Sequence, residues 1–84
     1  MTNKEILKKQ IIYRSTHRGS KEMDLLLGNF VKKYIKEFDD IELNDLKNLL
    51  FLDDEVIRKW HFENISNDAI TKTKVSALLQ NFKL

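Results

Sequence analysis

The sequence contains no cysteine, which excludes disulfides, thiolate catalysis and cysteine-ligated zinc or iron–sulfur sites. It also has no proline and only two glycines, so little in it would break a helix. No run approaches the roughly 18–20 apolar residues needed to cross a bilayer. The opening residues MTNKEILKKQ place charges where a secretory signal needs an apolar region. We therefore expect an intracellular protein without a membrane span.

Charge is distributed unevenly along the 84 residues, although the net charge is only +2. Residues 1–38 carry nine Lys and Arg against four Asp and Glu, whereas residues 39–84 carry six against nine. A basic half of this kind indicates either an anionic partner or a solvated lysine-rich face. The length fits one small domain, here residues 1–84.

Apolar residues at helical spacing predict an all-α fold. A first helix is expected from about residue 4 to residue 17. A longer helix, central to the bundle, is expected to bury an apolar stripe made of Met23, Leu26, Leu27, Phe30, Val31, Tyr34, Ile35 and Phe38. Three shorter helices are expected after these, with N-caps at Asn44 and Asp53 and a last helix that includes Ile70. The prediction is a compact bundle of about five helices.

The break between the first two helices is short and highly charged. Gly19 is expected to end the first helix in a left-handed conformation, with Arg14, His17 and Arg18 in the last turn. Ser20 is the expected N-cap of the second helix.

No residue pattern indicates a self-sufficient active site or a metal site. Ser15 and His17 are two residues apart on one helix, so their side chains would point about 200° apart and could not form a nucleophile–base pair. His61 is a lone histidine that we expect to be structural or solvated, and Trp60 beside it is expected in the core. We predict no catalytic, cofactor-binding or metal-binding residues.

Two binding classes remain open from the residues alone. Basic residues in the first half, such as Lys8 and Lys9, would suit nucleic acid, although Glu22 and Asp24 lie in the turn that would face phosphates. A generic helical adaptor is also consistent with the composition.

Leu25 falls on the side of its helix opposite the apolar stripe, so either another helix of the bundle or a partner protein covers it.

The segment RGSKEMDLLLGNF resembles the Arg-Gly-x-x-Glu motif, with a following Asp and apolar helix, of the FAD assembly factors of succinate dehydrogenase. YRS upstream and DDEVIRKW downstream resemble the same family. The resemblance implies a small helical bundle that binds the flavoprotein subunit of succinate dehydrogenase, or of fumarate reductase in some bacteria. It also implies that the factor promotes covalent attachment of FAD to a histidine of that client. The resemblance further implies that the client itself makes the flavin bond, and we expect the factor to hold no FAD stably.

The resemblance also implies which residues meet the partner. Arg18, Gly19 and Glu22 match the motif, and Asp24 matches the acid that follows it. The expected partner-binding set is Arg14, Arg18, Gly19, Glu22, Asp24 and Leu25. The chain departs from the family pattern at Ser20, usually a hydrophobic residue, and at His17, often another basic residue. We expect a protein that is monomeric when free and resides in a bacterial cytoplasm, with the mitochondrial matrix as the second possibility.

Overall fold

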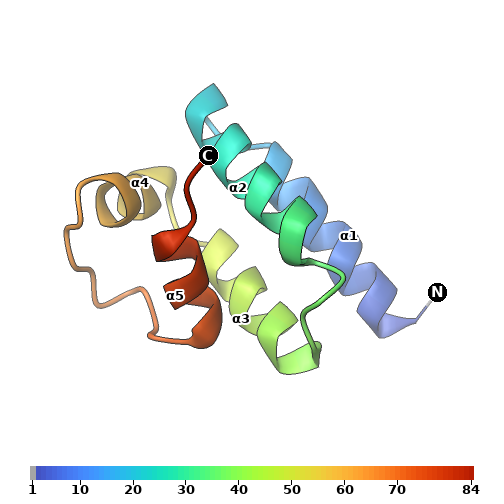
Figure 1. Ribbon diagram of the computed structural model, residues 1–84. Helices are drawn as coiled ribbons and strands as arrows, with labels where there is room; N and C mark the ends of the chain where they lie inside the picture. The colour runs from blue at the N-terminus through green and yellow to red at the C-terminus, as the bar shows by residue number, and fades with distance from the viewer. Residues whose placement is uncertain (1) are drawn as a thin grey trace.

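The computed structural model describes residues 2–84, and these form five α-helices and no strand (Figure 1). The helices are α1 (Asn3–Thr16), α2 (Lys21–Tyr34), α3 (Asp40–Leu50), α4 (Asp54–Phe62) and α5 (Lys74–Asn81). The predicted all-α bundle of about five helices is therefore confirmed. No helix in this part of the chain is long and apolar enough to span a membrane.

Figure 1 shows α1 and α2 in blue to green, and α3, α4 and α5 in yellow-green to red. α1 and α2 lie side by side and run in opposite directions, and α1 also packs along α3. α5 packs against both α3 and α4. We expected the second helix to be central, and this is wrong: α1 and α3 each have two close helical neighbours, whereas α2 lies closely along α1 alone.

The core nevertheless takes its largest share from the apolar stripe of α2. Five side chains of this helix are buried: Met23, Leu26, Leu27, Phe30 and Val31. The ring of Phe30 lies 5.4 Å from the ring of Phe82, edge to face, which ties α2 to the end of the chain. The periodicity therefore predicted which side of α2 is buried.

Two helix boundaries differ from the prediction. α2 ends at Tyr34, and the apolar pattern continues into the turn that follows, where Ile35 and Phe38 are also buried. α3 begins after Asp39 and not after Asn44. The Asp39 carboxylate accepts a hydrogen bond from the Glu42 N–H at 2.8 Å, and the Glu42 carboxylate accepts from the Asp39 N–H at 2.9 Å. This capping box satisfies N–H groups that a helix start leaves free.

The last two helices agree better with the prediction. Asp53 occupies the N-cap position of α4 as expected, although its side chain makes no capping hydrogen bond. Trp60 of α4 is 7% exposed, so the prediction that it belongs to the core is confirmed. α5 begins after Thr73, so Ile70 lies outside it but is still buried against the core.

Candidate partner-binding site

Hydrogen bonds from side chains hold the short connection between α1 and α2 in one conformation. α1 ends at Thr16 with His17 as the C-cap residue. The Ser20 hydroxyl accepts a hydrogen bond from the Met23 N–H at 3.2 Å, which confirms Ser20 as the N-cap of α2. The Asp24 carboxylate accepts from the Arg18 N–H at 2.6 Å, so the first turn of α2 also fixes the backbone of the connection.

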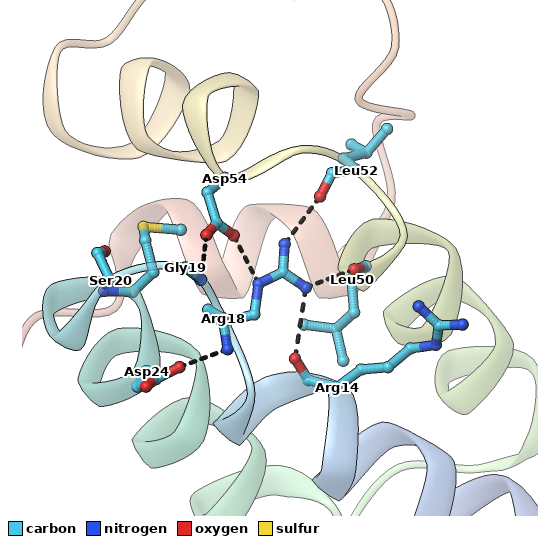
Figure 2. Close-up of polar contacts among 9 residues, drawn as sticks. Arg14, Arg18, Gly19, Ser20, Asp24, Leu50, Leu52 and Asp54 are labelled. Atoms are coloured by element: carbon cyan, nitrogen blue, oxygen red, sulfur yellow. Dashed lines mark hydrogen bonds and ion pairs between the residues drawn. The ribbon is translucent and has the colours of Figure 1, made fainter.

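The guanidinium group of Arg18 points into the molecule, toward Leu50, Leu52 and Asp54 (Figure 2). Its Nε donates to Asp54 Oδ1 at 2.6 Å. Nη1 donates to the Leu50 carbonyl at 2.6 Å, and Nη2 donates to the Leu52 carbonyl at 2.8 Å. The Arg18 side chain is only 9% exposed. Arg18 therefore links the α1–α2 connection to the end of α3 and the start of α4, and its charge lies at the C-terminal end of α3 that favours a cation.

Gly19 has a different role from the one expected. Among residues 2–84 no glycine has a positive φ, so the prediction of a left-handed glycine is wrong. The Gly19 N–H donates to Asp54 Oδ2 at 2.8 Å, and a Cβ at this position would lie 3.1 Å from the same oxygen. Glycine suits this position because Asp54 approaches the backbone closely.

The predicted partner-binding residues thus divide into two groups. Arg18 and Asp24 are partly buried and hold the connection in shape, together with the Gly19 backbone. The other three, Arg14, Glu22 and Leu25, are exposed. We call residues 18–25, which include Glu22, Leu25 and their immediate support, the motif corner, and Arg14 of α1 lies outside it.

Leu25 is 48% exposed, so its expected place outside the core is confirmed. The alternative that another helix of the bundle covers it is wrong. An exposed leucine beside a fixed, charged turn has the character of an interface anchor with a polar rim.

Glu22 lies near Arg58, which belongs to a cluster of paired charges on and just beyond α4. Arg58 of α4 forms a two-point contact with Glu55, at 2.9 Å and 3.1 Å, and a further contact with Glu63 at 3.2 Å. The hydrogen bonds and charge of Glu55 raise the pKa of Arg58, with smaller contributions from Glu63 and Glu22. The hydrogen bonds and charge of Arg58 in turn lower the pKa of Glu55. Glu22 therefore lies beside a cluster in which Glu55 and Glu63 already pair with Arg58, and Glu55 also pairs with Lys59.

The histidines and Ser15 are engaged in local contacts. The Ser15 hydroxyl donates to the Ile12 carbonyl at 2.8 Å, and His17 Nδ1 contacts the Tyr13 carbonyl at 2.8 Å. His61 Nε2 lies 2.8 Å from the Phe82 carbonyl. Among residues 2–84 no group of three or more His, Asp or Glu side chains is placed to hold a metal ion.

Sequence reasoning missed Asp54, which is the acceptor for both Arg18 and the Gly19 N–H. The available signal was its position in DDEVIRKW, a segment that resembles the same family as the Arg-Gly-x-x-Glu motif.

Comparison of the chain with known proteins identifies its family. Residues 9–83 match the family described as flavinator of succinate dehydrogenase. The chain is 43% identical to the mitochondrial succinate dehydrogenase assembly factor 2 of Scheffersomyces stipitis, over 71% of this chain and 40% of the relative. It is 36% identical to the protein of the same name in Saccharomyces cerevisiae, over 96% of this chain and 54% of the relative. An FAD assembly factor of Acetobacter pasteurianus is 33% identical over 66% of this chain and 50% of the relative.

The chain spans about half the length of the curated relatives it matches. No solved structure matches it. We expected a bacterial cytoplasmic protein, and the comparisons contradict that expectation, because the yeast relatives are named as mitochondrial. The match over nearly the whole chain agrees with the motif corner and the helical bundle: this chain belongs to the family of flavinators of succinate dehydrogenase.

Proposed function

We propose that this chain is an assembly factor that binds the flavoprotein subunit of succinate dehydrogenase and promotes covalent attachment of FAD to that subunit. The observation that carries the proposal is the family match over residues 9–83, which includes the Arg-Gly-x-x-Glu motif. The structure adds support because the motif builds a fixed corner with an acidic and an apolar side chain exposed on it.

The roles within the motif corner differ between residues. Arg18, Gly19 and Asp24 keep the connection between α1 and α2 in one conformation, which lowers the entropy that binding must remove. Glu22 accepts hydrogen bonds from a cationic side chain or a backbone N–H of the client. Leu25 supplies the apolar contact beside it.

The chemistry itself belongs to the client. Covalent attachment requires a client histidine held close to the 8α carbon of an oxidised flavin, and stabilisation of negative charge that develops on the flavin ring. Positioning alone can contribute several kcal/mol to such a reaction, on the order of what effective molarities allow. The factor favours the client conformation in which these groups meet, and it holds no FAD stably itself.

Two finer points belong to the same proposal. The flavoprotein subunit of fumarate reductase is an alternative client, which the resemblance implies for some bacteria. We further propose that the free factor is a monomer, because its described residues bury an apolar core without a second copy of the chain.

The test uses cells that lack the factor and compares wild type, Glu22→Ala and Glu37→Ala. Glu37 is an exposed glutamate just beyond the C-terminal end of α2, whereas the motif corner includes the start of that helix. Glu37→Ala therefore removes the same charge as Glu22→Ala but away from the motif corner. Wild type and Glu37→Ala should capture the flavoprotein and restore its in-gel flavin fluorescence, whereas Glu22→Ala should lose most of both. If wild type neither captures the flavoprotein nor restores the flavin, the proposed function is wrong.

A further inference from the structure

A groove of about 560 Å³ lies between α1 and α3, and Arg18 is among its lining residues. The side chains that matter to its chemistry are Lys9, Tyr13, Arg14, His17, Lys47 and Phe51. Arg18 lies at its end, so the groove leads directly to the motif corner. We call it the cationic groove.

No acidic residue lines the cationic groove, although the chain has 13 acidic residues and a net charge of only +2. Arg18 is neutralised by Asp54. Arg14 and Lys47 are different, because neither forms an ion pair with any residue in the described range 2–84. The groove therefore holds positive charge that the chain itself does not balance.

Both of these cations lie over the aromatic ring of Phe51. The Arg14 guanidinium carbon lies 3.9 Å from the centre of the ring, and Lys47 Nζ lies 5.9 Å from it. A guanidinium group stacked on a ring keeps its N–H edge available, and this edge matches the two oxygens of a carboxylate. The groove is thus prepared for carboxylates before any partner arrives.

Exposed rings border the same groove. Tyr13 is 62% exposed and stacks on His17, with 3.9 Å between ring centres and 15° between planes. Phe51 is 52% exposed. A small inorganic anion would leave both rings in water, whereas a polypeptide segment with an apolar side chain would cover them. Tyrosine and arginine are also the residue types enriched at energetically dominant positions of protein interfaces.

We propose that the cationic groove binds an acidic segment of the flavoprotein client, with carboxylates on Arg14 and Lys47 and an apolar side chain between Tyr13 and Phe51. This inference rests on the proposed function, which supplies the client. It extends the interface from the motif corner along α1 to α3. Because the exposed Glu22 is acidic and the groove is basic, the extended interface carries charge of both signs, and this favours one orientation of the client.

The test measures the dissociation constant for the purified flavoprotein subunit at two salt concentrations. The groove variant is Arg14→Glu/Lys47→Glu. The control is Lys32→Glu/Lys36→Glu, which makes the same change in net charge at exposed positions at and beyond the end of α2. The groove variant should bind the flavoprotein at least about tenfold more weakly than wild type, and its dissociation constant should depend less on salt, because charge pairs with the client determine both the affinity and its salt dependence. The dissociation constant of the control should stay within about twofold of wild type.

Circular dichroism melts establish that each variant is folded. Should the double charge reversal not fold, Arg14→Gln/Lys47→Gln removes the same charges more gently and should weaken binding by about threefold or more.

Three outcomes overturn the inference, and they are distinct. If wild type binds the flavoprotein and the groove variant binds equally well, or the control loses as much, the groove does not meet the client. If wild type does not bind the flavoprotein at all, the proposed function fails together with the inference. If wild type prefers a 20-base-pair DNA duplex and the groove variant loses that binding, the groove serves nucleic acid.

Discussion

Arg18 and Glu22 belong to one short motif, yet the structure gives their side chains opposite surroundings. The Arg18 guanidinium reaches across to Asp54 and to two backbone carbonyls, and it is 9% exposed. Glu22 is exposed at the first turn of α2. At the scale of single residues, the motif therefore combines a structural arginine with a side chain that is available to a partner.

Replacement of Asp54 should show how much the Arg18 contacts contribute to stability. Asp54→Ala leaves a largely buried guanidinium without its carboxylate and the Gly19 N–H without its acceptor. We expect the free energy of unfolding to fall by about 2–3 kcal/mol, somewhat less than for a fully buried pair because Asp54 is partly exposed. Urea unfolding measures this.

The neighbouring Asp53→Ala variant is the matched control for Asp54→Ala. Its carboxylate is exposed and makes no capping hydrogen bond, so the change should stay within about 0.5 kcal/mol. Equal effects of the two substitutions would contradict the role given to Asp54.

The two glycines should respond to alanine in opposite directions. In Gly19→Ala the new Cβ would lie 3.1 Å from Asp54 Oδ2, so the contact must shift and stability should fall by about 1 kcal/mol. Gly28 lies within α2, and in Gly28→Ala the Cβ would lie 3.5 Å from a methyl group of Thr16 in α1, which is an ordinary van der Waals contact. Stability should therefore rise by about 0.5–1 kcal/mol through helix propensity. Thermal unfolding distinguishes the two, and a stabilising Gly19→Ala would refute the close-approach explanation.

At the scale of helices, the sequence predicted buried faces better than helix ends. The apolar spacing of α2 identified its buried side, because that side depends on periodicity within one segment. The start of α3 was missed, although Asp39 and Glu42 have the spacing of a capping box. The apolar turn from Ile35 to Phe38 continued the pattern of α2 and obscured the boundary.

The capping box at Asp39 provides a prediction at this scale. Asp39→Ala removes the acceptor for the Glu42 N–H, so the free energy of unfolding should fall by about 1 kcal/mol. Glu42→Gln should cost less, because an amide oxygen can still accept from the Asp39 N–H. Chemical denaturation should show a larger loss of unfolding free energy for Asp39→Ala than for Glu42→Gln. The reverse order would contradict the role given to the cap at the start of α3.

At the scale of the whole molecule, the candidate site depends on contacts that join distant parts of the chain. Asp54 lies 36 residues from Arg18 and 35 from Gly19. Phe51 of the cationic groove is similarly remote from Arg14 in sequence. Pattern and resemblance could identify the motif residues, but only the packing of α1 against α3 shows that Arg18 is turned inward and that Arg14 stacks on a ring. The division of the motif into support and contact therefore required the structure.

The most direct measurement compares Arg18→Gln and Glu22→Gln in the same preparation for unfolding free energy and for flavinylation of the client. We predict that Arg18→Gln loses about 2 kcal/mol or more, because it breaks a partly buried network, and that flavinylation falls with it. Glu22→Gln should keep its stability within about 0.5 kcal/mol and still lose most client binding and flavinylation. An Arg18→Gln protein as stable as wild type, or a Glu22→Gln protein with normal flavinylation, would contradict this division of roles.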